Sequence, residues 1–194
     1  DLNKIVDSHC HLDFKDFDSD RDKIVNNAKL TNVDYLLTIS VNLEDFEKVH
    51  EVTQNYENIW CTTGIHPNNV SSEPDTIQLD DIQNRISENL KNKKVVGLGE
   101  TGLDFFRGKK NRTNQIESFM LHLFLSGEKK YPTIVHTRDA DNDTINCLNE
   151  SVKKYSSTGL IHCFTSTKQF AKKALDNGFY ISFSGIITFK NAID

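Results

Sequence analysis

Residues 95–100 read Val95-Val96-Gly97-Leu98-Gly99-Glu100, an apolar run that ends in a single carboxylate. Apolar residues at successive positions are typical of a strand that is buried on both faces, and such strands belong to parallel sheets covered by helices. In (β/α) barrels the active-site residues stand at the carboxyl ends of the strands. This stretch therefore favours an α/β fold with its chemistry at one edge of the sheet.

The same pattern recurs along the chain. Short apolar strands are expected at residues 4–7, 35–40, 59–65, 95–100, 133–136, 159–162 and 179–183. Between them, helical spacing of three and four predicts core-facing stripes, which consist of Leu79, Ile82, Ile86 and Leu90; Ile116, Phe119, Met120, Leu123 and Phe124; Ile145, Leu148 and Val152; and Phe170, Ala171, Ala174 and Leu175. Alternating strands and helices predict a parallel sheet, either doubly wound or a (β/α) barrel.

The motifs described below favour the barrel. A complete barrel has eight strands, and only seven are found here. We therefore predict one TIM-type (β/α) barrel domain over residues 1–194, incomplete at its C-terminal end.

Composition narrows the function classes. No apolar run approaches transmembrane length and the N-terminus has no signal-peptide core, so we expect no membrane association. The four cysteines show no C-x-x-C spacing, which favours buried thiols and a cytoplasmic setting. The formal net charge of −5 argues against a broad basic surface for nucleic acid, so a phosphate substrate would need metal ions and local cations. No obligate protein partner is evident.

Metal-competent side chains stand at several strand ends. In Asp7-Ser8-His9-Cys10-His11-Leu12-Asp13, two histidines lie two residues apart, so their imidazoles point to the same face of a strand. Alone, this pair could equally be ordinary histidines near a turn. Three further groups also follow apolar runs, namely Glu100, His136 and His162. Together they predict a metal site, in which a bridging carboxylate between two cations would suit phosphodiester hydrolysis.

Five stretches make the pattern specific. They are 7–13, Gly64-Ile65-His66-Pro67, 99–107 (GETGLDFFR), His136-Thr137-Arg138-Asp139-Ala140 and Ile161-His162-Cys163-Phe164-Thr165. In this order they resemble the motifs of the TatD family of metal-dependent deoxyribonucleases. The resemblance covers nearly the whole chain.

The resemblance implies an amidohydrolase-type barrel that binds one or two divalent cations, usually magnesium, manganese or zinc. It implies metal ligation by His9, His11, Glu100, His136 and His162. It further implies catalytic roles for Glu100, His66 and Arg138, and substrate binding by Asp104, Arg107 and Arg138.

Structural alternatives exist for the residues outside the ligand set. Arg138 could form a surface ion pair with Asp139 or Asp141, and His66 could simply pack under the loop turned by Pro67. Asp104 could cap the turn after Gly102, and Arg107 could be a solvated cation of the loop. His50 and His122 match no motif and are interpreted as ordinary helix residues.

The chain departs from the family at its end. The family continues to an eighth strand that ends in Glu-Thr-Asp, whose Asp binds metal and positions the attacking water. Asp194 ends no convincing strand and is not assigned that role. A trimmed chain, a disordered tail and a natural truncation all remain compatible with this.

The leading hypothesis is metal-dependent hydrolysis of phosphodiester bonds, with DNA as substrate. One alternative is hydrolysis of a small amide, ester or lactone, because the same ligands can polarise a carbonyl group. Another is a truncated metal-binding protein without turnover. Activity on an oligonucleotide compared with small amides separates the first two.

Overall fold

Seven parallel strands form a single sheet in the computed structural model, which describes residues 4–71, 77–106 and 111–192. Their order in the sheet is their order in the chain. The strands are β1 (Ile5–Cys10), β2 (Val33–Thr38), β3 (Ile59–Thr63), β4 (Val95–Asp104), β5 (Thr133–Arg138), β6 (Gly159–Ile161) and β7 (Tyr180–Ile181). Arg107 and Asp194 lie outside the described residues.

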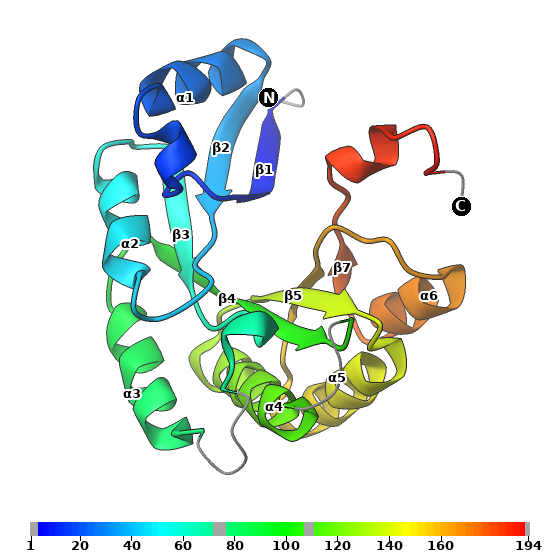
Figure 1. Cartoon of the computed structure of the whole chain (residues 1–194). Coiled ribbons are helices and arrows are strands. Elements are labelled where there is room, and N and C mark those ends of the chain that lie inside the picture. Colours follow the sequence, from blue (N-terminus) through cyan, green and yellow to red (C-terminus); the bar gives the residue numbers. More distant parts are fainter. Residues whose placement is uncertain (1–3, 72–76, 107–110, 193–194) are drawn as a thin grey trace.

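Helices follow the strands and cover the outer face of the curved sheet (Figure 1). They are α1 (Arg21–Leu30), α2 (Phe46–Gln54), α3 (Leu79–Asn89), α4 (Arg112–Lys129), α5 (Asp141–Tyr155) and α6 (Lys168–Asp176). Three short 3₁₀ helices lie at Lys15–Phe17, Pro67–Asn69 and Gly185–Thr188. Within the described part of the chain, no helix has the length and apolarity needed to cross a bilayer.

The predicted α/β fold with seven parallel strands is confirmed, and it forms a half-barrel. Among the described residues, β1 pairs only with β2 and β7 only with β6, so the sheet has two free edges. The edges approach each other where Ser8 Oγ lies 3.3 Å from Ser182 Oγ. A cavity of about 570 Å³ lies between these edges.

Several strand bounds differ from the prediction, since β1 reaches Cys10 beyond the predicted 4–7 and β7 covers only part of 179–183, and two further differences concern β4 and the helices. β4 continues beyond Glu100 to Asp104, because after a register shift it pairs again with β5, with Gly102 opposite His136. Helices α1 and α2 have no counterpart among the four predicted stripes. In α1 the signal is weak, since Val25 is its one buried residue, whereas α2 buries Phe46, Val49 and Val52 at a spacing that could have been recognised.

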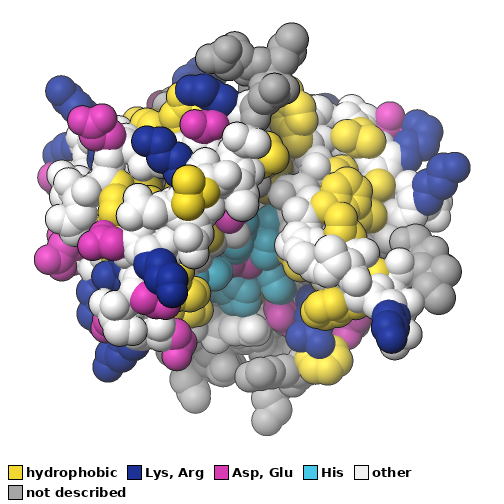
Figure 2. Space-filling view, turned by 90° about the horizontal axis from the view of Figure 1, so that it is seen from above, with side chains coloured by type: hydrophobic (Ala, Val, Ile, Leu, Met, Phe, Trp, Pro, Cys, Tyr) yellow, Lys and Arg dark blue, Asp and Glu magenta, His cyan; other side chains and the backbone are white. Residues whose placement is uncertain are grey.

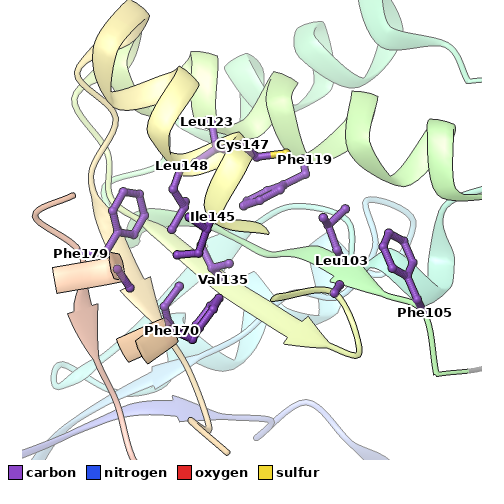
Figure 3. Close-up of a cluster of buried hydrophobic side chains, with 13 residues drawn as sticks. Leu103, Phe105, Phe119, Leu123, Val135, Ile145, Cys147, Leu148, Phe170 and Phe179 are labelled. Atoms are coloured by element: carbon purple, nitrogen blue, oxygen red, sulfur yellow. The ribbon is translucent and has the colours of Figure 1, made fainter. Parts of the chain in front are cut away.

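The largest apolar cluster lies between β4–β7 and helices α4, α5 and α6 (Figure 3). Phe119 and Leu123 of α4 and Leu148 of α5 are fully buried there, against Leu103 of β4 and Val135 of β5. Removing such side chains typically costs about 2–5 kcal/mol each. This packing fixes β4 and β5, the two strands that carry Glu100 and His136.

Gly102 tests how closely these two strands must approach. Its φ is 136°, and a Cβ atom there would lie 2.0 Å from the carbonyl oxygen of His136. We expect Gly102→Ala to lower the free energy of unfolding by roughly 3 kcal/mol, because it adds backbone strain and a clash in one step. Gly185→Ala is the matched control, since a Cβ atom on Gly185 would have no neighbour within 4 Å. Equal urea midpoints for the two variants would contradict this account.

Candidate metal centre

The acidic and imidazole groups predicted at the strand ends converge on Glu100 of β4. Its Oε1 atom lies 2.6 Å from Nε2 of His162 and 3.1 Å from Nδ1 of His136. The same oxygen lies 3.5 Å from Nε2 of His66, and Oε2 lies 3.3 Å from Nε2 of His9. Glu100 itself is only 3% exposed. Figure 2 shows the histidines gathered around an acidic group at the floor of a hollow.

Potential ligand atoms fall into two groups that share this carboxylate. One group consists of His9, Glu100 and His162, and the other of His66, Glu100 and His136. Within each group the ligand atoms lie within 4.8 Å of one another. A carboxylate shared by two groups is the arrangement that a pair of bridged cations requires.

Two buried imidazole nitrogens fit a metal better than a hydrogen bond. His9 Nδ1 and His162 Nε2 have no hydrogen-bond partner within the described residues. Although His162 Nε2 is close to Glu100 Oε1, the two atoms are not aligned for a hydrogen bond. Buried polar atoms are ordinarily satisfied. A cation near His162 would accept the lone pair of this nitrogen and also offset the charge of Glu100.

His136 gives a second indication. Its Nδ1 lies 3.1 Å from Glu100 Oε1, and its Nε2 lies 3.1 Å from Asp104 Oδ2. A neutral imidazole carries one N–H, so it can donate to only one of these two carboxylates. The other nitrogen then faces an oxygen, lone pair to lone pair, unless a proton or a metal cation lies between them. The donor set therefore fits a divalent cation.

His11 lies beside the two groups and is a member of neither. Its ring centroid is 5.1 Å from that of His9, and the ring stacks on Phe14 at 4.8 Å. Nδ1 lies 3.2 Å from the carbonyl oxygen of Ile39, so it is the nitrogen that donates. This hydrogen bond places the lone pair on Nε2, which is the tautomer of a metal-ligating histidine that is held by a backbone carbonyl.

His66 takes the opposite tautomer. Its Nδ1 accepts a hydrogen bond from the backbone N–H of Asn68 at 3.1 Å, which caps the short helix Pro67–Asn69. In the neutral ring the proton is therefore on Nε2, the atom that faces Glu100. Distance alone would allow His66 to be a ligand, but this hydrogen bond makes it a donor. His66 thus caps the helix that begins at Pro67 and also faces Glu100, while its predicted catalytic role remains a prediction.

The charges in the centre are those that a metal site needs. Burial raises the pKa of the Glu100 carboxyl, but the adjacent imidazoles of His136, His162 and His9 outweigh it, and the pKa lies well below its ordinary value. Burial lowers the pKa of His66 to about 4 and also lowers the pKa of His9. At neutral pH the carboxylate is thus ionised and these two imidazoles are neutral, the forms that bind metal.

Asp104 serves the centre and the following turn at once. Besides its contact with His136, its Oδ1 accepts a hydrogen bond from the backbone N–H of Phe106 at 3.1 Å. Its own backbone N–H donates to the side chain of Gln115 in α4. The turn that Asp104 caps follows Asp104 itself and not Gly102, because β4 continues to Asp104, and the same side chain also contacts a proposed ligand.

Arg138 stands at the edge of the centre, at the end of β5. Its guanidinium lies over the ring of Phe106, with Cζ 3.5 Å from the ring centroid. Within the described ranges it forms no ion pair with Asp139 or Asp141. It lines a cavity of about 930 Å³ formed by the segments that follow β4, β5 and β6. The predicted role of Arg107 remains a prediction, because that residue falls outside the described ranges.

His122 has a larger role than its sequence context indicates. It lies in α4, as expected, but is fully buried, and its Nδ1 donates to the carbonyl oxygen of Ser118 at 2.7 Å. Its Nε2 accepts from the backbone N–H of Ile65 at 3.2 Å, directly before His66. No sequence motif marks a hydrogen bond between residues so far apart in the chain.

Comparison with known proteins identifies one family and several relatives with similar sequences. The sequence family described as TatD related DNase matches residues 6–194. The uncharacterised metal-dependent hydrolase YcfH of Escherichia coli K12 is 39% identical over 191 residues, which is 97% of this chain and 69% of YcfH. The 3′-5′ ssDNA/RNA exonuclease TatD of Cronobacter sakazakii is 30% identical over 93% of this chain and 66% of its own length.

A similar fold is found among solved structures. The crystal structure of YjjV, a TatD homologue from Escherichia coli K12, superposes with a TM-score of 0.85 at 24% sequence identity. The match covers 99% of this chain and 72% of the other. At this identity the likeness supports the fold alone.

The burial of His122 predicts how the free energy of unfolding depends on pH. Burial, partly offset by the hydrogen bond to Ser118, lowers its folded-state pKa to about 4 from 6.5. Below pH 6.5 the unfolded chain takes up a proton that the folded protein resists, so this stabilisation is present at neutral pH and is lost as the pH falls towards 4. The shift corresponds to about 3 kcal/mol.

We therefore expect the unfolding free energy of the parent protein to fall by about 3 kcal/mol more than that of His122→Gln between pH 7 and pH 4. Urea titrations at several pH values measure this difference. The other histidines are common to both proteins, so their contributions cancel. Parallel pH profiles would show that His122 is not buried in neutral form.

Proposed function

Because the chain belongs to the TatD-related DNase family, we propose that it hydrolyses phosphodiester bonds in DNA with the help of divalent cations. Family membership makes it a metal-dependent hydrolase, and the substrate is what the proposal adds. The name of the Cronobacter relative, an exonuclease of single-stranded DNA and RNA, supports a nucleic-acid substrate. Four unpaired cysteines support a reducing, cytoplasmic setting.

The observation that carries the proposal is the buried carboxylate of Glu100, surrounded by imidazoles on both of its oxygens. We assign His9, His11, Glu100, His136 and His162 as ligands of one or two cations, with Mg²⁺, Mn²⁺ and Zn²⁺ as the candidates. When bound, such cations supply Lewis-acid chemistry, which polarises a phosphoryl group and lowers the pKa of water.

The chain's other polar groups have separate tasks in this proposal. His66 presents Nε2–H towards the centre, where it can donate to a phosphoryl oxygen as negative charge develops. Arg138, at the rim, offers a planar guanidinium that can grip a phosphate through two hydrogen bonds. Asp104 holds the ring of His136 through Nε2.

The overall acidity of the protein is compatible with a polyanionic substrate under these conditions. The net charge of −5 gives no general attraction for DNA. Affinity must come from bound cations and from Arg138, which lie together at the carboxyl ends of the strands. A recessed centre of this kind favours a single strand or a strand end over continuous duplex.

The direct test is cleavage of a labelled single-stranded oligonucleotide with Mn²⁺ or Mg²⁺, and with chelator in parallel. We expect cleavage that requires the metal. A small amide, ester and lactone are assayed under the same conditions. Turnover of those compounds without oligonucleotide cleavage would replace the nuclease assignment, and bound metal without any turnover would indicate a metal-binding protein.

Glu100→Gln tests the bridging carboxylate. Glutamine keeps the size of the side chain but removes the charge shared by both ligand groups. We expect divalent-metal affinity, measured by isothermal titration, to fall by at least about 100-fold, and oligonucleotide cleavage to be lost with it. Unchanged metal affinity in this variant would mean that the cations bind elsewhere.

His66→Gln separates a proton donor from a ligand. If His66 donates through Nε2, the variant should lose roughly 100-fold or more in kcat while its metal affinity stays close to that of the parent. The comparison with Glu100→Gln provides the control. A fall in metal affinity as large as that of the Glu100 variant would instead make His66 a ligand.

A further inference from the structure

A cavity lies just past the carboxyl ends of β4, β5 and β6, the strands on which, or directly after which, Glu100, His136 and His162 lie. It measures about 930 Å³ and is lined by the segments that follow these strands, including Phe106, Arg138, Asp141 and Thr165. Two of its lining residues, Arg138 and Phe106, lie two positions beyond His136 and beyond Asp104, the residue that contacts the ring of His136.

Phe106 forms an exposed aromatic surface in this cavity. The ring is 57% exposed, whereas its neighbour Phe105 is buried in the apolar cluster. The guanidinium of Arg138 covers part of it, with Cζ 3.5 Å from the ring centroid. Asp104 fixes the backbone at Phe106 through a hydrogen bond and also contacts His136. The ring is thus held at a defined place relative to the metal centre.

The cavity also has an acidic lining. Asp139, Asp141 and Asp143 all line it. Asp143 pairs with Arg112 at 2.6 Å, and Asp141 accepts a hydrogen bond from Ser166. Carboxylates repel a phosphate, but they accept hydrogen bonds from the exocyclic amino groups of nucleobases. The chemistry of the wall therefore suits a base, while phosphate is favoured on the side of Arg138 and the metal centre.

We propose that this cavity is a nucleobase subsite, in which the base next to the scissile phosphate stacks on Phe106 while Arg138 turns to the phosphate. The inference rests on the proposed nuclease function and deepens it, because it names what is recognised beside the reacting group. Stacking on an aromatic ring tolerates every base, since each has a π face. The subsite consequently selects for single-stranded nucleic acid, whose bases are free to leave the stack, and not for a particular sequence.

The test measures binding apart from cleavage. A fluorescent, nuclease-resistant phosphorothioate oligodeoxycytidylate and an equally long abasic oligomer are titrated by anisotropy at fixed salt, with and without Ca²⁺. We expect Phe106→Leu to weaken binding of the base-bearing oligomer roughly 5- to 100-fold and to leave the abasic oligomer unchanged. Phe106→Trp should retain the affinity of the parent for both.

Tyr180→Leu is the matched control, because Tyr180 is an aromatic residue of β7 that is 75% exposed and lies outside this cavity. It should bind both oligomers as the parent does. Unfolding midpoints and metal affinity are measured for every variant to exclude a general structural effect. Equal losses for both oligomers, no loss for either, or no binding of the base-bearing oligomer by the parent would each overturn the subsite.

Failure of the nuclease proposal and failure of the subsite proposal give different results in these experiments. If the parent cleaves no oligonucleotide but Phe106→Leu still loses base-dependent binding, the subsite stands and the reaction assignment falls. If the parent cleaves a normal oligonucleotide and the Phe106 variants bind both oligomers equally well, the nuclease assignment stands and the subsite falls.

Discussion

The ionised carboxylate of Glu100, buried among imidazoles, is the constraint on which the rest of the site depends. Burying an unpaired charge costs several kcal/mol, so a buried carboxylate persists only where partners compensate for it. Neutral imidazoles can donate hydrogen bonds, but they bring no positive charge. The positive charge that Glu100 needs is therefore lacking. The nitrogen of His162 without a hydrogen-bond partner, and the two carboxylates that face the single ring of His136, point to the same lack. Divalent cations would remove both the excess charge and the unpaired atoms.

The fold brings the partners of Glu100 together by joining parallel strands at one edge. His9 and His136 lie on β1 and β5, His162 directly follows β6, and His66 lies on the loop after β3. Close backbone approach is needed to bring these ends together. A Cβ atom on Gly64 would lie 2.6 Å from Cα of Gly99, directly before Glu100. The buried cluster beneath β4 and β5 then prevents the strands from moving apart.

Much of this arrangement could be predicted from the sequence because it follows from strand direction. Polar groups that end apolar strands must meet at one edge of a parallel sheet, and Glu100, His136 and His162 do so. The tautomer of His66 could not be predicted, because it depends on a backbone N–H that becomes available only when Pro67 turns the chain. The hydrogen bond that His122 accepts from Ile65 could not be predicted either, because Ile65 belongs to a distant segment of the chain.

The bounds of helices and strands could likewise be predicted only where they depend on local sequence. The apolar run at 95–100 indicated where β4 begins, but its extension to Asp104 depends on pairing with β5 after a register shift. Helix α1 was missed because its exposed surface is polar and it buries one residue. Local pattern therefore identified the strands and the ligand candidates. Contacts between distant segments decided which nitrogen of each imidazole faces the centre.

The most direct test of the account is a crystal structure grown with Zn²⁺, with anomalous diffraction recorded at the zinc edge. The account expects metal peaks on the two sides of the Glu100 carboxylate, one near His9 and His162 and the other near His136. Nitrogen ligands should lie about 2.0–2.1 Å from the zinc. Anomalous peaks that leave Glu100 uncoordinated, with its oxygens still facing the imidazoles directly, would contradict it.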